Sequence, residues 1–172
     1  MNVFISGSIS IDKLPLFALE KIDSIIVKDY RILIGDAKGV DLLVQEYLLK
    51  KEYKNIIVYF TGENIRNNAG NWKSNQIIDD SYKRKGRELY TLKDKAMARD
   101  ADYGLMIWDG KSKGTLGNIK EMKEQNKNFY VISNREIIDD KNIDSRINNK
   151  TPQKTTQRVL DLFKNSVSSW TS

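Results

Sequence analysis

Cysteine and histidine are both missing from this sequence of 172 residues. Without cysteine the chain can form neither a disulfide nor a thiolate metal site. Without histidine it can build neither a serine–histidine catalytic triad nor a histidine-ligated zinc site. These absences exclude much enzyme chemistry, and we expect no resident metal.

Long hydrophobic runs are missing as well. The longest, such as "SIIV" at 24–27 and "NIIVYF" at 55–60, fall far short of the roughly 20 residues that a membrane span needs. The first residues, "MNVFISGSIS", lack the basic start and long apolar run of a secretory signal. We therefore expect a cytoplasmic protein with no membrane partner.

Positive charge is in excess but unevenly placed. The formal net charge is +6, of which +4 falls on residues 141–172 and +2 on the rest. A basic tail can contact nucleic acid, although such a tail is more often simply solvated. We expect a folded domain over residues 1–134 and a polar, basic C-terminal extension over 135–172, with a short helix at 156–164.

Five short apolar runs have the character of buried strands, at 2–6, 31–35, 55–61, 103–108 and 129–133. Continuous apolarity is typical of strands that are covered on both faces. Between these runs, apolar residues recur at helical spacing over 13–28, 39–51, 91–101 and 115–126. The alternation predicts an α/β fold: a three-layer, Rossmann-like domain whose five-stranded, mainly parallel sheet carries helices on both faces.

Glycines and small polar residues follow three of these strands, in "SGSIS" (6–10), "GDAKGVD" (35–41) and "DGKSKGTLGN" (109–118). Loops at the carboxyl ends of parallel strands gather at one edge, where ligands bind. Glycines there let backbone amides face a phosphate, and a helix N-terminus adds more amides. Each loop alone is better explained by a tight turn, with Asp36 or Ser112 as a helix cap, but the three together favour a ligand.

The residues predicted to bind that ligand are Ser6, Gly7, Ser8, Gly35, Asp36, Lys38, Gly39, Asp41, Lys93, Asp109, Gly110, Lys111, Ser112, Gly114 and Thr115. The glycine spacing matches neither the P-loop nor the dinucleotide-binding fingerprint, so ATP hydrolysis is not inferred. Magnesium is expected only as a companion of a phosphate ligand.

The connection over residues 62–90 is long for a compact domain, and such segments are usually functional or disordered. Arginine clamps phosphates and an aromatic ring stacks on a base. We therefore predict a lid containing Arg66, Trp72, Arg84 and Arg87. The alternative is a solvated basic loop with Trp72 packed on the body of the domain.

Three motifs together resemble the SLOG superfamily of Rossmann-like nucleotide-binding domains, which includes the DprA/Smf and LOG proteins. Its small members pair "(I/V)SGS", "GGA-x-G-(A/V)-D" and "(W/F)DG-x-S-x-GT" loops. The matching residues here are Ile5 to Ser8, Gly35 to Ala37, Gly39 to Asp41, and Trp108 to Thr115 without Lys111 and Lys113. The resemblance, over about residues 1–133, implies a bound nucleotide or nucleotide-derived ligand, a sensor or regulatory role, and a homo-oligomer.

The sequence departs from the LOG motif PGGxGTxxE at the position of the glutamate, where Asn118 stands. Asparagine cannot ionise, so it cannot act as a general base in N-glycosidic cleavage. Glu63 and Asp109 are the candidate replacements, and whether any reaction is catalysed stays open. The alternatives are a nucleoside 5′-monophosphate N-glycosidase, resembling a phosphoribohydrolase or deoxyribosyltransferase, and single-stranded DNA binding in the manner of DprA. The nearly balanced charge of the body makes nucleic acid the less expected partner.

Overall fold

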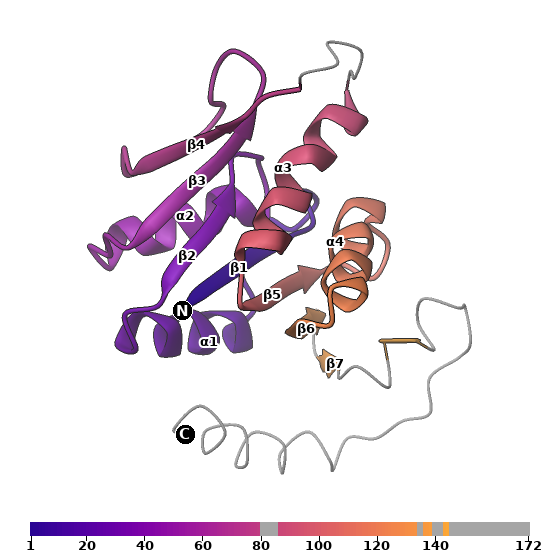
Figure 1. Ribbon diagram of the computed structural model, residues 1–172. Helices are drawn as coiled ribbons and strands as arrows, with labels where there is room; N and C mark the ends of the chain where they lie inside the picture. Colours follow the sequence, from indigo (N-terminus) through magenta and orange to yellow (C-terminus); the bar gives the residue numbers. More distant parts are fainter. Residues whose placement is uncertain (80–85, 134–135, 139–142, 145–172) are drawn as a thin grey trace.

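The computed structural model describes residues 1–79, 86–133, 136–138 and 143–144. Within these residues seven strands form one sheet, in the order β4-β3-β2-β1-β5-β6-β7 (Figure 1). The strands are β1 Asn2–Gly7, β2 Arg31–Gly35, β3 Ile56–Thr61, β4 Lys73–Ile77, β5 Tyr103–Trp108, β6 Asn128–Ser133 and β7 Glu136–Ile138. The helices are α1 Leu16–Val27, α2 Val40–Lys50, α3 Arg87–Asp100 and α4 Lys113–Glu124. The expected Rossmann-like α/β class is confirmed.

The strand order reverses next to β1. From β1 the chain adds β2, β3 and β4 on one side, and then returns to place β5 and β6 on the other side. All neighbours from β4 to β6 are parallel, and β7 runs antiparallel beside β6. Ser6 and Gly7 pair with Met106 and Ile107, so β1 and β5 end side by side. Such a switch point leaves a crevice at the carboxyl edge of the sheet.

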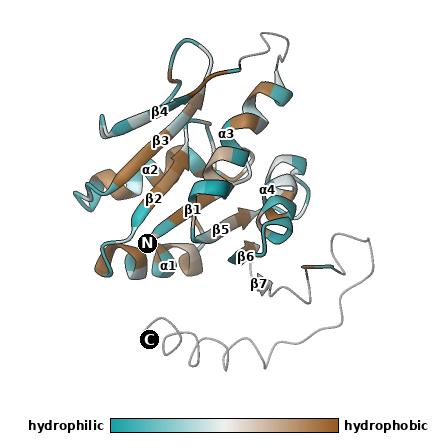
Figure 2. Cartoon of the chain, viewed as in Figure 1, coloured by the Kyte–Doolittle hydropathy of each residue, from teal (hydrophilic) through white to brown (hydrophobic). Residues whose placement is uncertain are grey.

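Two apolar cores lie on opposite faces of the sheet because side chains alternate along each strand. Val3 and Ile5 of β1 join the core beneath α1 and α2, whereas Phe4 points into the core beneath α3 and α4. In Figure 2 the central strands are hydrophobic along much of their length, while the helices also carry hydrophilic residues. The helices α3 and α4 thus lie side by side on one face, as Figure 1 also shows.

Two strands were not expected from the sequence. Strand β4, "KSNQI", lies within the segment 62–90 that was expected to be a loop, and it forms the edge of the sheet beside β3. Its residues are exposed or half-buried, so the strand lacks the apolar run that marks a buried one. Strand β7 has three residues and continues the sheet beyond residue 134. Over the described part of the chain, the sheet therefore has seven strands rather than five.

The C-terminal extension is mostly outside the described residues, including the helix expected at 156–164 and the expected boundary at 134–135. Ile143 is described, and it is fully buried in the core beneath α3 and α4. Among the described helices, none has both the length and the apolar character to cross a membrane.

Candidate functional site

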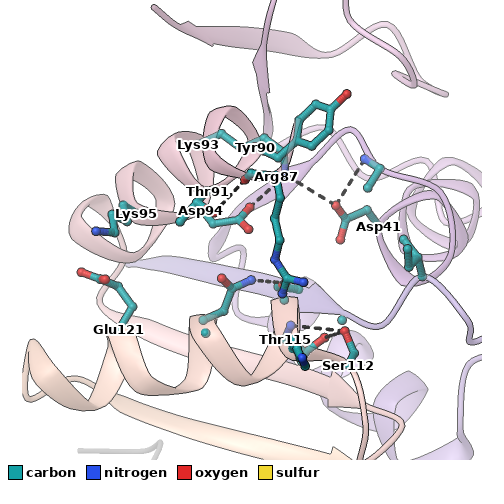
Figure 3. A pocket seen from close by; sticks show the side chains of 18 of the residues that line it. Asp41, Arg87, Tyr90, Thr91, Lys93, Asp94, Lys95, Ser112, Thr115 and Glu121 are labelled. Carbon is teal, nitrogen blue, oxygen red and sulfur yellow. Dashed lines mark hydrogen bonds and ion pairs between the residues drawn. The ribbon is translucent and has the colours of Figure 1, made fainter. Parts of the chain in front are cut away.

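A cavity of about 700 Å³ opens at the carboxyl edge of the sheet, between α3 and α4 (Figure 3). Its walls come from the loops after β1 and β2, from Arg66, and from the two helices. Among the described residues that line it, seven side chains are lysine or arginine and four are carboxylates, so these side chains carry a net positive charge when all are ionised. The volume is typical of a site for a small organic ligand.

The glycines of residues 109–118 have two different roles. Gly110 has a φ of +80° and makes the turn after β5. Gly114 and Gly117 lie instead within α4, whose N-cap Ser112 accepts a hydrogen bond from the amide of Thr115. A side chain built on Gly117 would meet nothing within 4 Å. The two helical glycines therefore leave the face of α4 toward the cavity open.

The N-terminus of α4 has an unusual neighbour in the guanidinium of Arg87. A Cβ built on Gly114 would stand 3.8 Å from the Nη2 atom of Arg87, and Figure 3 shows this side chain crossing the cavity from α3 toward Thr115 and Ser112. The first amides of a helix have no acceptor within it and carry partial positive charge. A cation at that position is unfavourable unless an anion lies between the two.

A hydrogen-bonded polar floor joins the loop after β1 to α4. The Asn118 amide donates to Ser6 Oγ over 2.8 Å, and Ser8 Oγ lies 3.2 Å from Thr115 Oγ1. The backbone amide of Asp109 donates to Ser8 Oγ over 3.1 Å. These pairs align the glycine loops with each other, and Asn118 has a structural partner where LOG enzymes carry a glutamate.

A buried charge cluster forms the wall beside β2. Lys93 Nζ lies 2.9 Å from Asp94 Oδ1 and 4.0 Å from Asp41 Oδ2. A Cβ on Gly35 would stand 2.4 Å from Asp41 Oδ2 and 2.5 Å from Lys93 Nζ, so the glycine leaves room for the pair. Burial raises the pKa of Asp41 to about 6. Burial lowers the pKa of Lys93, but Asp94 and Asp41 outweigh it and raise that pKa above its usual value.

The structure brings many of the predicted ligand-binding residues into one cavity. Those that line it are Ser6, Gly7, Lys38, Asp41, Lys93, Ser112, Gly114 and Thr115, together with the predicted lid residues Arg66 and Arg87. The predicted residues that do not line it are Ser8, Gly35, Asp36, Gly39, Asp109, Gly110 and Lys111. Among these, Ser8 belongs to the polar floor and Gly35 lies behind the charge cluster.

Asp36 is fully buried and faces Arg66 rather than the cavity. The backbone amide and the Nε atom of Arg66 donate to Asp36 Oδ2 over 3.1 and 2.9 Å, and its Nη2 atom donates to Oδ1. Burial raises the pKa of Asp36, but these bonds to Arg66 outweigh it and lower the pKa below its usual value. The carboxylate therefore anchors the segment after β3.

Neither candidate catalytic carboxylate lines the cavity. Glu63 is exposed in the loop after β3. Asp109 Oδ1 accepts the amides of Lys111 and Ser112, and its Oδ2 accepts from Ser10. Partial burial raises the pKa of Asp109, but these hydrogen bonds lower it to about 2. A carboxylate held so fully by hydrogen bonds shapes the turn and is poorly suited to donate a proton.

The residues of the predicted lid do not all lie at the cavity. Trp72 is buried in the core beneath α1 and α2, where its indole donates to the carbonyl of Tyr53 over 3.0 Å, so it is a core residue and not a lid residue. Arg84 lies outside the described residues. Arg66 and Arg87 reach the cavity from different elements, the loop after β3 and the first turn of α3.

Tyr90, Thr91 and Asp94 on the face of α3 toward the cavity were not predicted from the sequence, although Arg87 and Lys93 of the same helix were. Arg87, Tyr90, Thr91 and Asp94 follow the i, i+3, i+4, i+7 spacing of a helix, and all four line the cavity. The helix was expected to begin at 91, and a polar stripe is ordinarily a solvated one. The other lining residues that were not expected at the site are Ile9, Ala37, Gly117, Asn118, Lys120, Glu121 and Glu124.

Comparisons with known proteins agree with the fold. No family model matches the sequence, and no curated protein matches it. The solved structure of DNA processing protein A from Helicobacter pylori, described for its single-stranded DNA binding mode, is similar, with a TM-score of 0.58 and 17% sequence identity. The match covers 96% of this chain and 81% of that chain. The chain thus has a DprA-like, Rossmann-like fold, as the resemblance in the sequence implied.

Proposed function

We propose that this protein binds a nucleotide or a nucleotide-derived ligand, a nucleoside phosphate or a molecule like ADP-ribose, in the cavity between α3 and α4. The observation that carries the proposal is the Arg87 guanidinium over the N-terminus of α4. Two positive groups that face each other across a cavity are stabilised by an anion between them, and a phosphate accepts from both. The role is that of a sensor or regulatory module.

The rest of the cavity supports a ligand with phosphate groups. Lys38, Lys113 and Lys95 add cations to the lining, and cations near a phosphate favour its binding by charge and by hydrogen bonds. Among the described residues, no group of three or more carboxylates is placed to hold a metal ion. Any magnesium would therefore arrive with the phosphates of the ligand.

Replacement of Arg87 by alanine tests this proposal. We expect AMP, ADP or ADP-ribose to raise the thermal midpoint of the wild type, and Arg87→Ala to weaken their binding about 10- to 100-fold, the value of a hydrogen bond to a charged group. Isothermal titration calorimetry measures the change. Arg99→Ala is the matched control, because Arg99 is on the same helix but is mostly exposed and pairs with Asp100. Equal affinities of the two variants would contradict the proposal, as would a wild type that binds none of the ligands.

Glycosidic cleavage gains no support from the two carboxylates predicted to catalyse it, because neither Glu63 nor Asp109 lines the cavity. Single-stranded DNA binding is the second candidate function, favoured by the DprA-like fold and by the cations of the cavity. It predicts that affinity rises with oligonucleotide length and falls steeply with salt. Fluorescence anisotropy with labelled oligonucleotides of increasing length separates the two candidates, since a mononucleotide site gives no dependence on length.

A further inference from the structure

Tyr90 is an exposed aromatic residue at a cavity whose lining includes many charged side chains. It lies on α3 one turn after Arg87, and 40% of its surface is exposed. The guanidinium of Arg66 lies 4.4 Å from the centre of its ring. This cation–π contact covers one face of the ring, and the exposure shows that the described residues leave much of the remainder open.

The position of Tyr90 depends on a buried carboxylate. Asp36 holds Arg66 through its backbone amide and its guanidinium, and Asp36 is fully buried. The amide of Asn67 donates to the carbonyl of Asp36 over 2.8 Å and ties the same segment down. Because Asp36 holds both the backbone amide and the guanidinium of Arg66, the guanidinium face that contacts Tyr90 has a fixed position. Asp36 therefore holds Arg66 in place, and Arg66 in turn positions the ring of Tyr90.

A second exposed apolar side chain lines the same cavity. Ile9, in the loop after β1, is 59% exposed. Its backbone packs so closely on Gly39 that a Cβ there would stand 2.4 Å from the Ile9 Cα atom. Apolar side chains that are left exposed in a cavity are costly in water and favour a ligand with an apolar part.

We propose that Tyr90 is the platform on which the base of the ligand stacks, with the phosphates directed toward Arg87 and the N-terminus of α4. This inference rests on the proposed function and narrows its ligand class to molecules that carry a planar base, as opposed to phosphorylated sugars. Stacking on an aromatic ring tolerates any base, so Tyr90 selects for the presence of a base and not for its identity. Arg66 and Asp36 act as positioning residues for the ring.

The test compares ligands with and without a base. AMP and ADP-ribose are titrated beside ribose 5-phosphate into the wild type, Tyr90→Ala and Tyr90→Phe. We expect Tyr90→Ala to weaken the binding of AMP and of ADP-ribose about 5- to 100-fold, as for loss of one stacked base. The affinity for ribose 5-phosphate should not change. Tyr90→Phe keeps the ring and should bind within about twofold of the wild type. Asp36→Asn should lower the affinity for the two base-containing ligands and leave the affinity for ribose 5-phosphate unchanged.

The other possible outcomes contradict either the role of Tyr90 or the proposed function as a whole. If Tyr90→Ala weakens all three ligands equally, or none of them, the platform is refuted while the phosphate site stands. If the wild type binds none of the three, the proposed function fails and the platform fails with it. Since Tyr90 is exposed, the thermal midpoint of Tyr90→Ala should match the wild type, and this measurement separates loss of stacking from loss of fold.

Discussion

Replacement of Gly39 by alanine is expected to lower the free energy of unfolding by about 2–6 kcal/mol. Gly39 is the N-cap of α2 and has a φ of +76°, which costs a residue with a Cβ about 1–3 kcal/mol. The new Cβ would also stand 2.4 to 2.7 Å from backbone atoms of Ile9. The loop after β1 would have to move, and overpacking of this kind costs about 1–3 kcal/mol more.

Two other glycines are matched controls for this prediction, which urea unfolding measures. Gly62 also has a positive φ, +86°, but a Cβ there would meet nothing within 4 Å, so Gly62→Ala carries the backbone strain without the collision. Gly117→Ala carries neither and should stabilise α4 by about 0.5–1 kcal/mol, because glycine is a poor residue within a helix. If Gly39→Ala cost no more than Gly62→Ala, the close packing of the β1 loop on α2 would be refuted.

The strands and helices that position the site could be predicted because their pattern is local. Runs such as "RILIG" at 31–35 have no polar face, so they must lie within a sheet that is covered on both sides. Parallel strands then bring "SGSIS" and the turn at Gly110 to the same edge. Strand β4 could not be found in this way, because an edge strand with exposed side chains has the composition of a loop.

The parts of the site that sequence reasoning missed depend on partners distant in the chain. Asp36 follows a strand and precedes a helix, the ordinary place of a ligand-binding carboxylate, yet it is paired with Arg66, 30 residues further on. Nothing in the segment after β3 marks Arg66 as that partner. Trp72 was equally consistent with a lid and with the core, and only the acceptor at Tyr53 shows which it is. Local pattern identifies the edge of the sheet, whereas pairing determines which side chains face the cavity.

Replacement of Lys93 by methionine is expected to destabilise the fold by about 3–5 kcal/mol at neutral pH, the cost of leaving a buried charge without its partner. Lys93 is 4% exposed, and it is the cation between Asp94 and Asp41. Methionine keeps the length of the side chain and removes the charge, so the loss of stability comes mainly from the two carboxylates that no longer have a cation beside them. Chemical unfolding of Lys93→Met, Asp41→Asn and the double variant measures the coupling. The double variant Lys93→Met/Asp41→Asn should recover part of the lost stability, because the side chain at position 41 then carries no charge that needs a partner.

The cost of Lys93→Met should depend on pH with a definite sign. Burial raises the pKa of Asp41 from 3.8 to about 6, so the folded protein binds a proton that the unfolded chain has already released. The stability that this group contributes is present in full below the unfolded pKa and is lost as the pH rises through about 6. Without Lys93 to favour the ionised form, the loss is larger, and the deficit of the variant should widen between about pH 5 and pH 8. A deficit that is constant over this range, or that persists undiminished in the double variant, would show that Lys93 does not neutralise Asp41.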